Sequence, residues 1–189
     1  MTILVTPKPE HLPAYVAALE RGWSPDNMRA EVAQEQLALI EQDPAAFLDN
    51  MDDEEAKAGP VKMPDGTTIE RSPGIHRWLW DSAAPEDPFC GSLGFRWQPH
   101  SNALPAHVLG HIGFAVVPWK QRQGHAKAAL ALILPEARSR GLEYVELTTE
   151  PNNIASRRVI EANGGVLVEQ FEKAAMYGGG EALKFRIKV

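Results

Sequence analysis

The stretch His111-Ile-Gly-Phe-Ala-Val-Val-Pro-Trp-Lys-Gln-Arg-Gln-Gly-His-Ala-Lys127 decides the fold, because it contains a junction between a strand and a helix. Its first half is apolar and rich in β-branched residues, which predicts a strand over 108–117. Pro118 ends that strand, since proline has no N–H to give to a sheet ladder. The spacing Gln121-x-x-Gly124-x-Ala126 follows, and apolar residues at helical spacing predict a helix over 125–140.

The start of this predicted helix has the properties of an anion site. The first N–H groups of a helix have no partner within it, and the helix dipole adds partial positive charge there. A diphosphate can therefore sit on the backbone of 122–126. Gly124 permits a positive φ and a close approach, and Ala126 leaves room because it is small. Arg122 and Lys127 add positive charge around the same turn.

The segments around the junction alternate between strand and helix patterns. A strand, a helix of four turns and a β-rich segment at 144–149 form a βαβ pattern, whose connection is long enough for a parallel crossover. Pro135 predicts a kink in the helix or the end of its regular part. The other predicted elements are strands at 2–6, 76–81, 89–97, 166–171 and 183–189, and helices at 11–23, 27–40, 45–58 and 155–162.

Composition places limits on the class of protein. The length of 189 residues suits one domain over 1–189, with a projecting hairpin or arm at 59–74 around the turn signal Pro64-Asp65-Gly66. A net charge of −6 argues against a nucleic-acid partner, and no apolar run approaches the ~18 residues of a membrane span. The start is unlike a secretory signal, and the single Cys90 permits no intramolecular disulfide, so we expect a cytoplasmic protein.

A second stretch, Glu150-Pro-Asn-Asn-Ile-Ala-Ser-Arg-Arg-Val-Ile-Glu-Ala-Asn-Gly-Gly165, follows the second strand of the βαβ unit. With both stretches the chain resembles the GNAT acetyltransferase superfamily, best over residues 75–175. The resemblance implies an α/β fold with a mixed, mostly antiparallel central sheet of six or seven strands and helices on both faces. It also implies one splayed parallel pair, formed by the strands that end near Val117 and Thr149.

The resemblance implies acetyl-CoA as cosubstrate and no metal. The pantetheine arm would lie in the split between the parallel strands, the diphosphate would sit on the turn at 121–126, and a backbone N–H near Val116 would polarise the acyl carbonyl. From the residues alone, Asn153 has the alternative role of a helix cap, and Ser156 that of a surface helix residue. The implied cofactor-binding residues are Phe114, Ala115, Val116, Gln121, Arg122, Gln123, Gly124, His125, Ala126, Lys127, Asn153 and Ser156.

Direct acetyl transfer to a primary amine in a ternary complex needs a general base. His111 is the candidate we favour, because it stands where several relatives carry glutamate and it titrates near neutral pH; a structural role is its alternative. The tyrosine that many relatives use as general acid is replaced by Ile160, so Ser156 or water would have to supply that proton. The alternative bases are His107, Glu146 and His76.

The sequence does not identify the acceptor, which is expected to be a small-molecule amine or a peptide amino group. A homodimer is a further possibility that the sequence leaves open. Arg96 has two interpretations: it binds an acidic group of the substrate, or it is a partly exposed strand arginine. Trp78 and Trp80 are expected on one face of a strand, as core or pocket wall. The rival function is a non-catalytic acyl-CoA-binding sensor or scaffold, because the usual tyrosine is missing at position 160.

Overall fold

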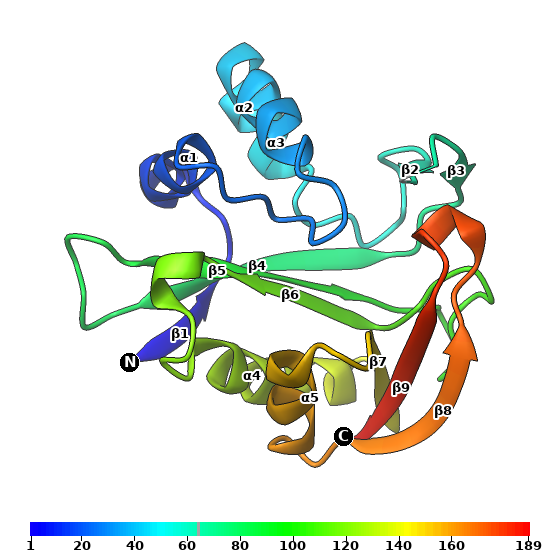
Figure 1. Cartoon of the computed structure of the whole chain (residues 1–189). Coiled ribbons are helices and arrows are strands. Elements are labelled where there is room, and N and C mark those ends of the chain that lie inside the picture. The colour runs from blue at the N-terminus through cyan, green and yellow to red at the C-terminus, as the bar shows by residue number, and fades with distance from the viewer. Residues whose placement is uncertain (64) are drawn as a thin grey trace.

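The computed structural model describes residues 1–63 and 65–189, and its strands form two main sheets (Figure 1). Every strand pair in the two sheets is antiparallel, which confirms a mostly antiparallel architecture. The first sheet has the order β1-β4-β5-β6, from β1 (Thr2–Val5), β4 (Gly74–Asp81), β5 (Phe89–Arg96) and β6 (Ile112–Val116). The second has the order β7-β9-β8, from β7 (Tyr144–Thr149), β8 (Val166–Glu172) and β9 (Glu181–Lys188).

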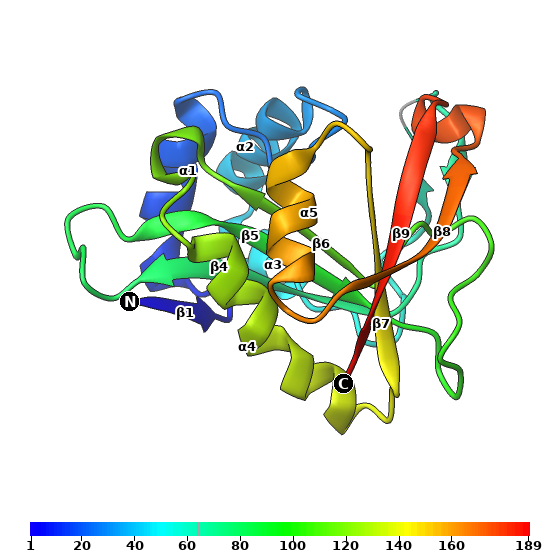
Figure 2. The same ribbon diagram turned by 60° about the horizontal axis from the view of Figure 1, so that its bottom comes forward.

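Helices cover both faces of the strand layer, as predicted (Figures 1 and 2). On one face lie α1 (Leu12–Glu20), α2 (Val32–Gln42) and α3 (Pro44–Asp49), and on the other lie α4 (His125–Ser139) and α5 (Ile154–Glu161). Three short 3-10 helices, η1 (Pro9–His11), η2 (Pro118–Lys120) and η3 (Ala175–Tyr177), complete the fold. None of the helices in the described part of the chain is long and apolar enough to cross a membrane.

Side chains of β6 alternate between two cores, because successive residues of a strand point to opposite faces. Ile112, Phe114 and Val116 belong to the core on the α4 side. Ala115 and Val117 belong to the core under α1, where Tyr15 stacks on Trp78 with ring centroids 4.2 Å apart. The alternation fixes which face of β6 each later site residue can use, and Trp78 is part of the core.

The two sheets meet where β6 and β7 begin. The His111 N–H donates to the Glu146 carbonyl at 2.7 Å, and among the described residues no further backbone hydrogen bond joins 112–116 to β7. The predicted single sheet is therefore divided into two at this point. A parallel pair of β6 and β7 stays a prediction, since no ladder connects the two strands in the part of the chain that the structure describes.

Several predicted elements are shorter in the structure, and in each case polar contacts explain why. The predicted strand over 108–117 begins only at Ile112, because a turn occupies 105–108 and the Leu109 carbonyl accepts the Thr148 hydroxyl. The predicted helix over 45–58 ends at Asp49, since the backbone of Asp53 bridges Gly74 at the edge of the sheet.

The other helices differ from the prediction at their ends. The predicted helix over 27–40 begins only at Val32, because the Asp26 carboxylate holds the N–H groups of Met28 and Arg29 in a turn. Conversely, α4 continues through Pro135 to Ser139, so the helix does not end at the proline, and the alternative of a kink stays a prediction.

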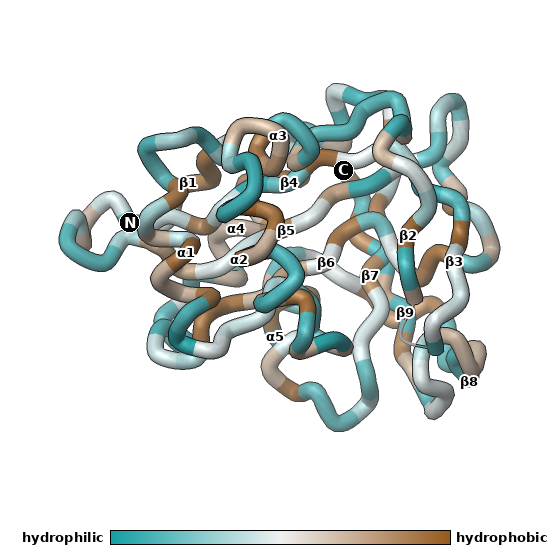
Figure 3. Tube along the Cα trace, turned by 90° about the horizontal axis from the view of Figure 1, so that it is seen from above, coloured by the Kyte–Doolittle hydropathy of each residue, from teal (hydrophilic) through white to brown (hydrophobic). Residues whose placement is uncertain are grey.

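The segment at 59–74 contains two short antiparallel strands, β2 (Val61–Lys62) and β3 (Thr68–Ile69). Pro64, the first residue of the predicted turn, lies outside the described residues. Figure 3 views the face covered by α1, α2 and α3 from above, with α1 and α2 over the β1 end and the β2–β3 hairpin near the opposite end.

Candidate functional site

The turn before α4 presents a row of backbone N–H donors to solvent, at residues 122–127, which we name the donor turn. Arg122 and Gly124 both adopt left-handed backbone conformations, with φ of 61° and 88°. The first hydrogen bond of α4 runs from the Ala128 N–H to the Gly124 carbonyl. Among residues 1–63 and 65–189, no protein group accepts the N–H groups of residues 122–127. Because the residues of 121–124 are exposed, these donors can reach a ligand.

Side chains around this turn divide into exposed and buried groups. Arg122 and Lys127 are exposed next to the unpaired N–H groups and add positive charge. The His125 ring is buried instead, and its Nδ1 shares a hydrogen bond of 2.9 Å with the Thr2 hydroxyl. Burial lowers the pKa of His125. His125 therefore offers the turn its backbone N–H and not its imidazole, while the small Ala126 keeps the helix start narrow.

The edge of β6 that faces β7 is open between the sheet junction and this turn. The odd-numbered residues of this segment bond to the backbone of β5: the His111 carbonyl accepts the Arg96 N–H, and the Val117 N–H donates to the Cys90 carbonyl. The alternate residues Phe114 and Val116 therefore point their N–H and C=O groups away from β5. The two carbonyls accept side-chain amides, Asn27 on Phe114 at 3.1 Å and Gln121 on Val116 at 3.4 Å. An extended ligand can therefore pair with this edge by displacing two side chains.

Asn153 caps α5, as one of its two interpretations predicts. Its Oδ1 accepts the Ser156 N–H at 3.0 Å, and the side chain is exposed. The cap uses the oxygen alone and leaves the amide N–H groups of Asn153 able to donate to a ligand. Ile160 is 1% exposed and belongs to the core below α5, so that position offers no proton to a site.

His111 is enclosed by the junction of the two sheets. Its side chain is fully buried, its Nδ1 accepts the Glu146 N–H at 2.9 Å, and its Nε2 has no hydrogen-bond partner in the described part of the chain. Burial lowers the pKa of His111 to about 4. The ring is thus neutral at pH 7 but a weak base, and its visible role is to join β7 to the start of β6.

Protonation of His111 sets a pH dependence of stability. Between the ordinary value of 6.5 and the folded-state pKa of about 4, the unfolded chain binds a proton that the folded chain does not. The contribution is complete above pH 6.5 and falls as the pH approaches 4, with a loss of about 2 kcal/mol at pH 5. Urea denaturation at pH 7 and pH 5 measures it. His111→Gln is expected to lose less stability between the two pH values than the unchanged chain, and equal losses would assign the effect elsewhere.

His76 has the geometry of a base that is ready to accept a proton. Its ring is exposed, and Nδ1 lies 2.6 Å from the Met51 carbonyl, which fixes the proton on Nδ1 and leaves a lone pair on Nε2. Desolvation by the surrounding protein lowers the pKa of His76 and outweighs the hydrogen bond to Met51, which raises it. Glu146, by contrast, is paired with Arg186 at 2.7 Å, and the Nε2 of His107 is buried without a hydrogen-bond partner in the described part of the chain.

His76 belongs to a group of residues that we name the sheet patch: His76, Gly94, Arg96 and Gly113. Gly94 pairs with both His76 and Gly113, so the three residues form a row across β4, β5 and β6. A Cβ on Gly94 would lie 3.5 Å from the His76 Nε2, and a Cβ on Gly113 would lie 3.7 Å from the Arg96 Nη2. Because the two glycines carry no side chain, the patch has a flat floor between the imidazole and the guanidinium.

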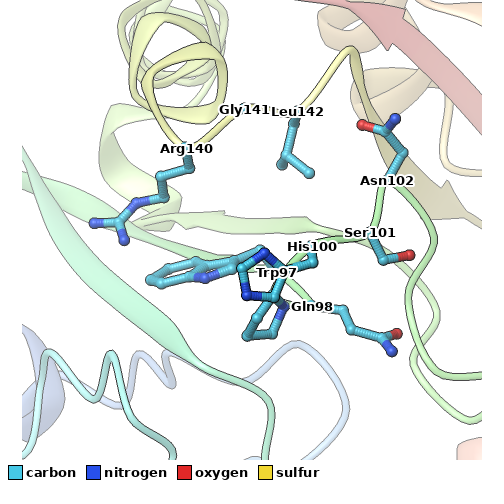
Figure 4. A pocket seen from close by; sticks show the side chains of 9 residues that line it. Trp97, Gln98, His100, Ser101, Asn102, Arg140, Gly141 and Leu142 are labelled. Carbon is cyan, nitrogen blue, oxygen red and sulfur yellow. The ribbon is translucent and has the colours of Figure 1, made fainter.

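A pocket of about 530 Å³ lies at the opposite end of α4 (Figure 4). Trp97, Asn102 and Leu142 line it, and the Arg140 guanidinium lies 3.8 Å from the Trp97 ring centroid. The 15-residue helix separates this pocket from the donor turn by roughly 22 Å, at about 1.5 Å per residue. None of the predicted site residues lines it. Within the described ranges no group of three or more His, Cys, Asp or Glu side chains is arranged to hold a metal ion, and the absence of a metal from the reaction stays a prediction.

Comparison with known proteins places these features in context. A family model described as an acetyltransferase (GNAT) domain matches residues 2–166. Similar solved structures include RimL, an α-N-protein acetyltransferase of a ribosomal protein, in complex with coenzyme A (14% identity, TM-score 0.64, 100% of this chain and 94% of that chain). They also include the microcin C7 self-immunity acetyltransferase MccE in complex with acetyl-CoA and AMP (10%, 0.64, 100% and 92%).

A third similar structure is the ribosomal-protein alanine acetyltransferase of Vibrio fischeri (15% identity, TM-score 0.58, 99% of this chain and 92% of that chain). A search of curated protein sequences gives no match. At these identities the structural similarities show the fold alone. The family match over residues 2–166 includes both the donor turn and the open edge of β6.

Proposed function

Because the chain belongs to the GNAT acetyltransferase family, we propose that it transfers an acetyl group from acetyl-CoA to a primary amine by direct attack in a ternary complex. The observation that carries the proposal is the row of unpaired N–H groups at residues 122–127, next to the open edge of β6. Two of the structural relatives were solved with coenzyme A or acetyl-CoA, which supports the same cosubstrate here.

The turn before α4 would hold the diphosphate of acetyl-CoA. The N–H groups of 122–127 and the positive end of the helix dipole favour two adjacent phosphates, and Arg122 and Lys127 add charge. Gln123 stands at the same exposed turn, where its amide donates to the Trp119 carbonyl at 3.3 Å. The backbone of His125 and Ala126 completes the cradle.

The pantetheine arm would pair with the open edge of β6, along Phe114, Ala115 and Val116. Its amide groups can replace the side chains of Asn27 and Gln121 on the Phe114 and Val116 carbonyls. The amide of Asn153 would donate to the arm from the other side. The Val116 N–H would polarise the acyl carbonyl, which stabilises the negative charge of the tetrahedral intermediate.

We assign the general base to His76, which takes the proton of the attacking amine through water. Its Nε2 lone pair is held ready by the Met51 carbonyl, whereas His111 is enclosed and has a pKa of about 4. The catalytic role of His111 stays a prediction that the geometry does not favour. The leaving thiolate would take a proton from water or from Ser156, which is half-buried on α5, since Ile160 has none to give.

The pH dependence of the rate distinguishes the two histidines. A base must be unprotonated, so kcat/KM is expected to fall as the pH drops through the pKa of His76, which lies below 6.5. His76→Gln is expected to remove this limb and to lower kcat roughly 100-fold. The matched variant His111→Gln is expected to keep the limb. A profile that loses the limb only in His111→Gln would assign the base to His111 instead.

Calorimetry with acetyl-CoA, followed by thiol release over a panel of amines, tests the proposed function. Acetyl-CoA binding with thiol release on a primary amine is the expected result, and absence of binding would overturn the proposal. Binding without release on any amine would favour the rival function, a sensor or scaffold. Two of the similar structures are acetyltransferases of ribosomal proteins, so the panel includes peptide amino termini beside small amines. Homodimerisation and a cytoplasmic location stay predictions.

A further inference from the structure

Arg96 is the cationic side chain of the exposed sheet patch. Among residues 1–63 and 65–189, no carboxylate lies within ion-pair distance of its guanidinium. The arginines that do pair with a carboxylate are Arg29, Arg71, Arg77, Arg140 and Arg186. Arg96 is exposed, so its fork of N–H groups is available to a ligand.

Asp26, Tyr177, His76 and the buried His111 are close enough to the Arg96 guanidinium for their charges to interact. Asp26 lies beyond ion-pair distance, and its Oδ1 is already used by the N–H groups of Met28 and Arg29. Tyr177 donates its hydroxyl to the His107 carbonyl, and His76 stands across Gly94. Desolvation by the surrounding protein lowers the pKa of Arg96, although the side chain stays accessible. The guanidinium is thus partly desolvated and has no carboxylate at ion-pair distance in the described part of the chain, which favours binding of an anion.

The position of Arg96 relates an anion to the reacting amine. Its Nη2 lies over Gly113, and Gly113 precedes Val116 by three residues along β6, or roughly 10 Å. In the proposed function the acetyl group is at the Val116 N–H and the base is His76, on the same patch. A small acceptor over Gly94 and Gly113 can therefore reach the acetyl group with its amine and Arg96 with its other end.

We propose that the acetyl acceptor is an amine that carries an anionic group, a carboxylate or a phosphate, and that Arg96 binds this group. This inference rests on the proposed acetyl transfer. Carboxylate and phosphate oxygens match the planar fork of a guanidinium in two parallel hydrogen bonds. The anion would neutralise Arg96 while the amine extends along β6 toward the acetyl group, with water between it and the His76 Nε2, so one binding event positions the nucleophile.

Matched pairs of amines test the inference by thiol release from acetyl-CoA. β-Alanine is compared with β-alaninamide, and 2-aminoethyl phosphate with ethanolamine, at equal concentrations of unprotonated amine. The acid-bearing member of at least one pair is expected to have a kcat/KM roughly 10- to 100-fold higher. The pair that shows the preference identifies carboxylate or phosphate. Arg96→Gln is expected to reduce the preference to about threefold or less.

Arg138→Gln is the matched control, because it removes the same charge from an exposed arginine at the far end of α4. It is expected to keep the preference. The inference is overturned by equal rates within both pairs, by a preference that survives Arg96→Gln, or by acetylation of neutral amines alone. Acetyl-CoA calorimetry on each variant separates these outcomes from failure of the proposed function, which would abolish cosubstrate binding. If Arg96→Gln does not fold, the comparison of amines on the unchanged chain still decides.

Discussion

Gly124→Val is expected to weaken acetyl-CoA binding roughly 10- to 100-fold. Gly124 has a φ of 88°, and valine at such a φ is strained because its branched Cβ meets the backbone. A Cβ at Gly124 has no protein atom within 4 Å, so the valine side chain would stand in the space over the exposed turn, where the phosphates are proposed to bind. Relaxation of the strain would turn the N–H groups of 122–127 away from that space. Calorimetric titration with acetyl-CoA measures the change.

Gly141→Val is the matched control for backbone strain. Gly141 follows the last turn of the same helix, has a φ of 81°, and likewise has no atom within 4 Å of its built Cβ. Both substitutions are expected to cost about 1–2 kcal/mol of unfolding free energy. Gly141→Val is expected to keep the affinity for acetyl-CoA, because it lies roughly 22 Å from the donor turn. Equal losses of affinity in the two variants would remove the turn from the cofactor site.

Gly91→Ala is expected to cost more stability than any other single change considered, at least about 4 kcal/mol. Gly91 has a φ of 148°, and a Cβ there would lie 2.1 Å from the Ala115 carbonyl oxygen and 2.9 Å from the Val116 Cα. Both contacts are to backbone, so β5 and β6 would have to separate. The separation would also displace the Val116 N–H that the proposed mechanism needs. Urea denaturation followed by circular dichroism measures the cost.

Gly113→Ala provides the comparison on the same pair of strands. Gly113 has an ordinary φ, and the nearest atom to its built Cβ is the Arg96 Nη2 at 3.7 Å, the end of a flexible side chain. We expect a change in unfolding free energy below about 1 kcal/mol. If Gly91→Ala were as mild as Gly113→Ala, the tight approach of β5 to β6 at position 91 would be wrong.

The turn that is proposed to bind the cofactor could be predicted from the sequence, because the features that form it are local. A strand stop at Pro118, a glycine with a positive φ at 124 and a helix that begins at His125 all lie within a few residues of one another. Both roles considered for Asn153 concern the start of one helix, and the structure shows the cap.

On the proposed acceptor side, the sequence offered His76 as an alternative base and Arg96 as a ligand for an acidic group, but their assembly into one patch depends on pairing between distant strands. His76, Gly94 and Gly113 adjoin only through the register of β4 with β5 and of β5 with β6. Resemblance to relatives drew attention to His111, and only burial at the sheet junction reveals its low pKa. The two glycines of the patch lie on strands, and the residue pattern of a single strand does not show why a glycine stands there. Asn27, expected in a helix, in fact lies in a turn that the Asp26 carboxylate holds, and from there it reaches the Phe114 carbonyl on a distant strand.

The division into two sheets has a consequence for synthesis of the chain. Every strand of the β1-β4-β5-β6 sheet lies within residues 2–116, and every strand of the β7-β9-β8 sheet lies within residues 144–188. Because the ribosome releases the chain from its amino terminus, the first sheet can close under α1 before the second has been made. The donor turn and α4 are synthesised between the two, so the proposed cofactor site is complete only when β7 is in place and the His111 Nδ1 accepts the Glu146 N–H. Assembly would thus end at the place where acetyl-CoA is proposed to enter.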